Sequence, residues 1–580
     1  MDQRMAGHNV IQLFYQIQSI PNSKSIEQSM DELISEKSNW RKLTGDIEEK
    51  PRMSDAEAFD ASRRVFPAVY FCREKGQFAD SLDGFDSRGW ISSDTFHGYF
   101  HPSVQQSLFH SETSPIRYAL SLIRSDATTG YPGELFLGRI KSIPKAPVLF
   151  EHVASELTVF SDRHAVLMVR VCLLENHVAT KGLDPGVWGF RRNLSASVAQ
   201  NCSLQLWMKF ADTIRCVHKK YETQERIDCF SVTLYSPASP SKDTGDDMVR
   251  VSVDPNDIGD WDQQKLFVNH VLKSLPNGVM MSDVKPPKVA GRSQPSGLVK
   301  DFVEPNAFIH SYIQWDMKPG IESTEMNERE LFALLSVDGG LDGSGTDSDF
   351  IRNGVRDHSI RRWAPANIFT AIDYACVTIV QSSPCYLSSE AGWRFHDLTY
   401  QHHARQYMWF VLMQLFYRGE LHDLSGQYSE VRVTKEGSRS PGDWIVKVLG
   451  GTEKGVKNAR AILNEYYNLN QKFFFTRVTN EVQGAELWRH YQEVMGISEL
   501  YRTVKEDMRE LNQRLIENNS DRQATRLLLL TVLSVLLGLA VFLGSGIGFG
   551  EGLRITGWVL AGIATLGVLG VLFVLVYSEV

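Results

Sequence analysis

The chain has 580 residues, enough for two or three domains, and its composition of 43% hydrophobic and 22% charged residues can form a real core. A formal net charge of −8 does not suggest a nucleic-acid-binding surface. The cysteines include no Cys-x-x-Cys pair, which argues against a disulfide framework or a cysteine zinc site and fits a reducing compartment.

Residues 1–297 are predicted to form an N-terminal sensing region of α/β or α+β class. The first sixty residues read as polar and helical. Short β-branched runs bounded by turn residues then predict strands at residues 65–72, 165–175, 228–236 and 248–253. Helical patterns lie between them, at residues 103–108 and 203–221. A stretch rich in Pro, Gly and Ser, residues 276–297, is predicted to be a linker.

Residues 298–480 are predicted to form a second, mostly helical region. Aromatic-rich helices are expected at residues 371–381, 404–418 and 459–475, with a hairpin at residues 428–433 and 444–449. His396 and His403 are seven residues apart, so a helix would bring their imidazoles toward one face. Spacing places no third ligand beside them, so structural histidines remain the stronger interpretation.

Residues 481–526 are predicted to be a stalk helix. From residue 486 onward there is no proline, and apolar residues recur at steps of three and four, among them Leu487, Tyr491, Val504 and Met508. The other faces are charged, which indicates one amphipathic helix with a seam for packing on other helices. Nothing breaks the pattern before residue 527, so the stalk and the following segment are expected to be a single rod of about 90 Å at 1.5 Å per residue.

Residues 527–580 are predicted to be a transmembrane hairpin. Residues 527–543 and 555–577 contain no charged residue, and each can cross a hydrocarbon core of about 30 Å, the first by including residues 544–549. Arg522 and Arg526 precede the first span, whereas the short turn has only Arg554. Basic residues stay on the cytoplasmic side, and the N-terminus does not resemble a signal peptide. The expected location is the cell (inner) membrane, with the N-terminal domain cytoplasmic.

This order of a large domain, a stalk helix, a span, a short turn, a second span and a short tail resembles the CorA family of divalent-cation channels. The resemblance covers about residues 474–580. The family's Gly-Met-Asn triplet is absent; Gly548, Phe549 and Gly550 stand at its place and supply no asparagine. The resemblance implies a homo-oligomer, with a pentamer favoured, and Mg²⁺ or another divalent cation as the transported or regulatory ion.

Three groups of residues are candidates for a pore. Small and hydroxylated residues share one face of the first segment and are candidates for the pore lining: Thr531, Ser534, Gly538 and Ser545. Close packing between helices explains the same stripe equally well. Glu551, with Gly548, Phe549 and Gly550, is the outer-mouth candidate, since repetition around an axis would form an acidic ring; a solvated turn is the alternative. Asn518, Asn519 and Asp521 are the inner-mouth candidates, or a solvated part of the stalk.

Three functions fit these patterns. The first is a homo-oligomeric cation channel or transporter gated by a small-molecule ligand on the cytoplasmic domain. The second is a membrane effector of a stress or antiviral defence system, activated by a nucleotide-type signal. The third is a membrane-anchored scaffold. The sequence contains no Gly-x-Ser-x-Gly, His-Glu-x-x-His or dinucleotide fingerprint, so catalytic residues are not expected.

Overall fold

The computed structural model of this chain describes part of its residues. The described residues are 4–18, 25–35, 40–43, 99–109, 114–120, 134–140, 148–175, 177–178, 187–191, 202–215, 227–231, 233–235, 248–252, 267, 275, 307–317, 327–337, 347–361, 367–381, 399, 402–433, 453–544, 559 and 562. The chain divides into two compact units. Unit 1 contains Met1–Glu420 and Phe473–Glu499, and unit 2 contains Leu421–Lys472 and Leu500–Val580.

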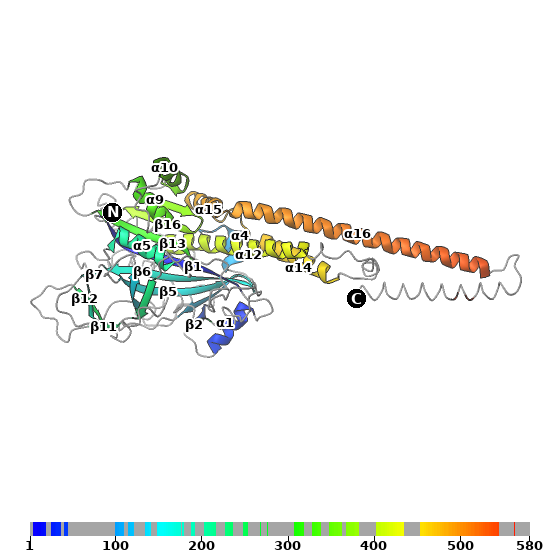
Figure 1. Ribbon diagram of the computed structural model, residues 1–580, viewed down its shortest axis with the longest axis horizontal. Helices are drawn as coiled ribbons and strands as arrows, with labels where there is room; N and C mark the ends of the chain where they lie inside the picture. Colours follow the sequence, from blue (N-terminus) through cyan, green and yellow to red (C-terminus); the bar gives the residue numbers. More distant parts are fainter. Residues whose placement is uncertain are drawn as a thin grey trace, which may run out of the picture. The chain divides into compact units, whose positions relative to one another are not determined.

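A 12-stranded mixed sheet organises unit 1, and its main path runs β10-β4-β5-β6-β1-β13-β16-β15-β14. Figure 1 labels its central strands β5, β6, β1, β13 and β16. Strands β2 and β3 branch from β5, and β9 pairs with β1. The strands of this sheet are β1 (Arg4–Gln18), β2 (Trp40–Leu43), β3 (Ile116–Leu120), β4 (Glu134–Ile140), β5 (Val148–Val159), β6 (His164–Glu175), β9 (Cys202–Ser203), β10 (Ile227–Ser231), β13 (Phe308–Met317), β14 (Ser359–Ile360), β15 (Asn367–Ile372) and β16 (Ala375–Gln381). A second sheet has four strands, β7 (His177–Val178), β8 (Val187–Arg191), β11 (Thr233–Tyr235) and β12 (Met248–Ser252).

Strand β1 lies in the middle of the large sheet, between β6 and β13, and is antiparallel to both. The prediction of a helical N-terminus is therefore wrong. Side chains alternate between the two faces of a strand, and here both faces are covered: Ile11 and Leu13 are buried on one face, and Val10 and Phe14 on the other. A strand covered on both faces lacks the alternation that would identify it, and in β1 the polar residues Asn9, Gln12 and Gln16 recur at steps of three and four, as on one face of a helix.

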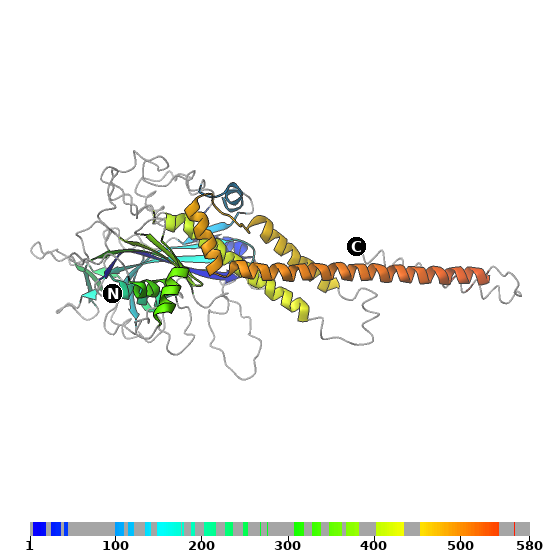
Figure 2. The same ribbon diagram turned by 90° about the horizontal axis from the view of Figure 1, so that it is seen from above.

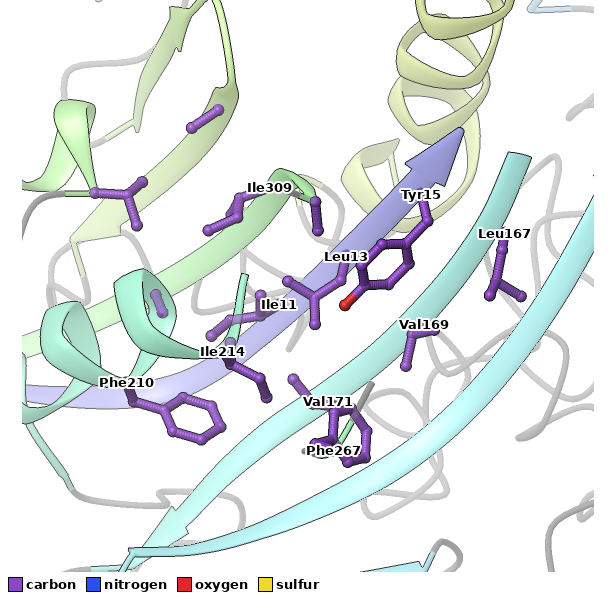
Figure 3. Close-up of a cluster of buried hydrophobic side chains, with 14 of the residues drawn as sticks. Ile11, Leu13, Tyr15, Leu167, Val169, Val171, Phe210, Ile214, Phe267 and Ile309 are labelled. Atoms are coloured by element: carbon purple, nitrogen blue, oxygen red, sulfur yellow. The ribbon is translucent and has the colours of Figure 1, made fainter. Parts of the chain in front are cut away.

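The main hydrophobic core lies on the face of the sheet that carries Ile11, Leu13 and Tyr15. Helices α1 (Ile26–Ser35), α5 (Leu204–Ile214) and α9 (Glu328–Ser336) contribute to it, as does Val355 of α10 (Ser348–Asp357). Figure 3 shows Phe210 and Ile214 of α5 near Ile11 of β1. Helix α9 begins with a capping box between Asn327 and Glu330, and α10 packs beside it.

Helices rich in aromatic residues pack on the opposite face. These are α4 (Pro102–Phe109), the π-helix η5 (His403–Tyr407), α12 (Met408–Val433) and α15 (Val482–Val494). The rings of Phe410 and Trp488 pack edge to face with their centroids 5.6 Å apart, and the centroids of Phe109 and Trp409 are 5.2 Å apart in the same arrangement. The sheet is therefore a central layer, with helices on both faces.

Some of the predicted elements are confirmed and others are wrong. The strand predicted at residues 165–175 corresponds to β6, and the helix predicted at residues 103–108 to α4. The helix predicted at residues 371–381 is wrong, because this segment forms the end of β15, a turn at Asp373 and Tyr374, and β16. The strand predicted at residues 428–433 is also wrong, since α12 continues to Val433. The predicted strand at residues 65–72 and linker at residues 276–297 lie outside the described residues.

Unit 2 contains the second half of α12, α14 (Glu453–Lys472) and most of α16 (Ile497–Gly544). Tyr428 of α12 donates to Glu510 of α16 at 2.8 Å, and Tyr501 of α16 donates to Asn470 of α14 at 2.9 Å. The predicted seam of α16 is buried along the residues Val504, Met508, Leu511 and Leu515. Helix α16 is continuous from its charged first part into residues 527–544 (Figure 2). The predicted rod does not begin at residue 486, because Gly496, with a φ of +68°, separates α15 from α16.

In the described part of the chain, none of the helices combines the length and the apolar character that a membrane crossing needs. This finding contradicts the predicted transmembrane hairpin at residues 527–580, together with the membrane location that depends on it. The apolar end of α16, residues 527–544, covers about 27 Å at 1.5 Å per residue, short of a core of about 30 Å. Residues 545–549, which the predicted first span includes, and nearly all of the second span lie outside the described residues.

Candidate functional site

The predicted pore-lining residues that the structure describes are Thr531, Ser534 and Gly538, and they lie on α16. Their positions share one face of the helix, and all three are exposed. The hydroxyl of Thr531 donates to the carbonyl of Leu527 at 2.8 Å, and that of Ser534 donates to the carbonyl of Leu530 at 2.8 Å. These hydroxyls are thus already hydrogen-bonded within their own helix, as serine and threonine often are in helix interiors.

The other predicted site residues cannot be assembled into a site from this structure. Ser545, Gly548, Phe549, Gly550 and Glu551 lie outside the described residues. Asn518, Asn519 and Asp521 belong to the continuous backbone of α16, and their side chains lie outside the described part. The inner-mouth and outer-mouth assignments therefore stay predictions.

The structure assembles a different cluster, a row of polar side chains on the sheet face that α12 covers. Gln12 of β1 is the register partner of Arg170 in β6 and of His310 in β13. Register partners on adjacent strands point to the same face, so the three side chains form a line across the sheet. Thr378 of β16 and His403 of η5 complete the set, which we call the polar row. All five residues are buried.

The hydrogen bonds of the row have a defined direction, which Arg170 determines. A guanidinium can only donate, so Gln12 must turn its amide oxygen toward Arg170. In that orientation the oxygen accepts from Nη2 at 2.5 Å and from Nε at 3.2 Å, and the amide nitrogen donates to Nδ1 of His310 at 2.7 Å. Nδ1 of His310 is therefore an acceptor, and its single proton is on Nε2.

His310 stacks face to face on His403, with ring centroids 3.8 Å apart and an interplanar angle of 17°. Nδ1 of His403 lies 3.0 Å from the hydroxyl of Thr378. Burial, and then the positive charge of Arg170, lower the pKa of His310 to about 3. At neutral pH the row therefore contains one permanent cation, Arg170, and a neutral imidazole at position 310.

A π-helix places His403 over the sheet. Segment η5 has the wide turn of a π-helix and leads directly into α12, whose first residue, Met408, has its sulfur 3.9 Å from Nη2 of Arg170. Short π-helical turns occur frequently at functional sites, because the inserted residue changes the direction of nearby side chains. His403, the first residue of η5, and Met408, the first residue of α12, thus both contact side chains of the row.

The polar groups of the row are an amide, a guanidinium, two imidazoles and a hydroxyl. Cys376 is the register partner of His310, and burial raises the pKa of its thiol well above the usual range, so it stays protonated and weakly nucleophilic. Within the described ranges, no group of three His, Cys, Asp or Glu residues is placed to hold a metal ion. The hypothesis of a metal site at His396 and His403 finds no support there, and His396 lies outside those ranges. What the row offers is a set of directed hydrogen bonds beside a buried cation.

Sequence reasoning noted His403 but missed the rest of the row. One signal was present: Arg170 is a charged residue within the otherwise apolar strand at residues 165–175. A buried arginine requires partners, but the sequence does not indicate which strands provide them. Comparisons with models of known protein families, with curated proteins and with solved structures find no match to this chain.

Proposed function

We propose that the protein is a non-catalytic homo-oligomer. Its copies associate through the C-terminal part of α16, beyond Leu515, and unit 1, which contains the large sheet, carries a regulatory site. The observation that supports this most directly is the exposure of apolar side chains beyond Leu515. The exposed fractions are 61% for Ile516, 65% for Leu527, 66% for Leu528 and 65% for Val535. Leu527, Leu528 and Val535 lie near one another along the helix, and exposed large apolar side chains that gather in this way mark an interaction site.

The position of this surface on α16 favours a second copy as its occupant. Where α12 and α14 accompany α16, the apolar seam is buried, and Leu515 is its last buried residue. Ile516 follows Leu515 directly, and after the mostly charged and polar residues 517–526 the exposed apolar residues resume at Leu527, on a different side of the helix from the seam. Thr531, Ser534 and Gly538 are small, which allows helices to approach closely.

One of the functional expectations from the sequence supports this proposal, and the others stand apart from it. A non-enzymatic role agrees with the raised thiol pKa of Cys376 and the neutral His310, both of which are unsuited to nucleophilic or acid–base chemistry at neutral pH. A regulatory small molecule on the sheet unit and a pentameric state stay predictions. Cation transport also stays a prediction, and since it requires membrane spans, we do not build on it.

The mass of the full-length protein in solution tests the proposal. Sedimentation velocity at micromolar concentration should give a discrete oligomer, and the double variant Leu527→Lys, Val535→Lys should shift it toward the 65.6 kDa monomer. Gln523→Lys, at an exposed polar position of the same helix, is the matched control and should leave the oligomer unchanged. A monomeric wild-type protein would overturn the proposal, as would vesicle binding by a protein that stays monomeric.

A further inference from the structure

The polar row contains a contact whose hydrogen bonding depends on proton uptake. His310 belongs to a central strand of the sheet, whereas His403 belongs to the π-helix that starts α12. Their rings are in face-to-face contact at 3.8 Å, so the pair joins the sheet to the helix layer. We propose that His310 and His403 form an acid-sensitive latch, which holds η5 and the start of α12 on the sheet while both imidazoles are neutral and releases them on protonation.

The hydrogen bond between Gln12 and His310 explains why a proton would break the latch. In the neutral state the amide nitrogen of Gln12 donates to Nδ1 of His310 at 2.7 Å. A proton on Nδ1 would turn that atom into a donor and bring two donors to a distance at which they repel. Gln12 cannot remove the conflict by rotating its amide, because its oxygen would then leave the guanidinium of Arg170 and its nitrogen would face a second donor.

Electrostatics act in the same direction as the hydrogen bonds. An imidazolium at position 310 would be buried and close to the permanent positive charge of Arg170. A positive charge on His403 would lie against the ring of His310. The hydroxyl of Thr378 can donate to or accept from Nδ1 of His403, so this hydrogen bond tolerates either protonation state of His403. Both histidines can regain water only if η5 moves away from the sheet.

Of the other described groups around the pair, His402 also responds to acid, whereas Cys376 and Tyr407 do not. Cys376 of β16 and Tyr407 of η5 have raised pKa values because of burial, and both stay neutral as the pH falls. Tyr312 of β13 is on the same face of the sheet as His310, and its ring centroid lies 5.8 Å from that of His403. His402 adjoins the pair in sequence but faces the rings of Tyr99 and Tyr407, and burial lowers its pKa to about 4.

The size of the expected response follows from proton linkage. In the released state, His310 is solvated and titrates at about 6.5, whereas in the latched state burial and Arg170 keep it neutral. For one histidine, local opening should therefore become about 30-fold more frequent between pH 7.5 and pH 5.0. The latch lies within unit 1 and does not depend on the assembly proposed for α16.

Hydrogen–deuterium exchange of the full-length protein, corrected for the intrinsic pH dependence of exchange, tests the latch. Peptides that cover residues 403–417 should be about 30-fold less protected from exchange at pH 5.0 than at pH 7.5. His310→Asn keeps an acceptor oxygen for Gln12 and takes up no proton, so this variant should lose most of the pH response. His152→Asn, which removes a buried histidine from the opposite face of the sheet, is the matched control and should keep it.

A second variant keeps the test decisive if His310→Asn fails to fold. Gln12→Glu offers carboxylate oxygens to both Arg170 and His310, so a protonated His310 gains a partner and acid should no longer open the segment. The proposal is overturned if residues 403–417 show no acid response in the wild-type protein. It is equally overturned if either variant retains the full wild-type response.

Discussion

The side-chain oxygen of Gln12 accepts two hydrogen bonds from Arg170, from Nη2 at 2.5 Å and from Nε at 3.2 Å. The two residues are register partners on adjacent strands, and both are buried. A buried charge is tolerated only when polar groups replace its lost hydration. Gln12 therefore has two roles: it provides part of the solvation of Arg170, and its fixed amide determines which tautomer His310 adopts.

Removal of the guanidinium should show how strongly the fold depends on this pair. We expect Arg170→Ala to lower the free energy of unfolding by about 3 kcal/mol, because it leaves a cavity and an unpaired amide oxygen on Gln12. Arg170→Met fills most of the volume and should cost about half as much. Urea unfolding at pH 7.5 measures both effects. If both variants had the same free energy of unfolding as the wild type, the pair of Gln12 and Arg170 would contribute nothing to stability.

Two glycines with different surroundings give a matched pair of substitutions. A Cβ on Gly484 of α15 would collide with the hydroxyl of Tyr99 and come within 2.7 Å of Cγ2 of Thr479. Gly484→Ala should therefore destabilise the protein by about 2 kcal/mol through overpacking. Gly426 of α12 is exposed and has nothing within 4 Å, so Gly426→Ala should stabilise by about 0.5–1 kcal/mol. Thermal unfolding should move in opposite directions for the two variants.

The break between α15 and α16 depends on the backbone of Gly496. Its φ of +68° is unfavourable for residues with a Cβ, although a Cβ there would meet nothing within 4 Å. Gly496→Ala should cost about 1 kcal/mol for conformational reasons alone. Gly496→Asn should cost less, because asparagine tolerates the left-handed region better. Equal unfolding midpoints for the two variants would contradict this explanation.

His402 should make the stability of the fold depend on pH. Burial against Tyr99 and Tyr407 lowers its pKa to about 4, below the value of about 6.5 expected in the unfolded chain. A lowered pKa in the folded state means that the unfolded state binds the proton first, so this stability is present above pH 6.5 and is lost as the pH falls toward 4. The slope attributable to His402 should approach about 1.4 kcal/mol per pH unit.

Unfolding by urea at several pH values between 7 and 4.5 measures that slope. His402→Phe keeps an aromatic ring between the tyrosines and should remove the share of the slope that His402 contributes, while the share of His310 remains. His422→Gln, at an exposed position of α12, serves as the control and should follow the wild-type curve. A variant at position 402 with the unchanged wild-type slope would assign the pH dependence to other groups.

The sequence identified the helices and strands whose apolar residues follow a clear local pattern. The apolar, β-branched run of residues 165–175 predicted β6, and the steps of three and four predicted the buried seam of α16 at Val504, Met508 and Leu511. The same reasoning failed for β1 and for the hairpin of β15 and β16, since strands buried on both faces lose the alternation that distinguishes them from helices. It also predicted membrane spans that the described helices do not provide. The predicted domain boundaries at residues 297, 480 and 526 stay predictions.

By itself, the sequence determined where much of the helical and strand structure lies, and it showed that a long helix near the C-terminus carries both a charged and an apolar part. Only the tertiary structure decided that Gln12, Arg170, His310 and His403 meet, because their strands and helix are joined by register and packing across hundreds of residues. A local pattern records the period of a helix or a strand. The choice of neighbouring strand comes from the simultaneous burial of all of them, which no single segment encodes.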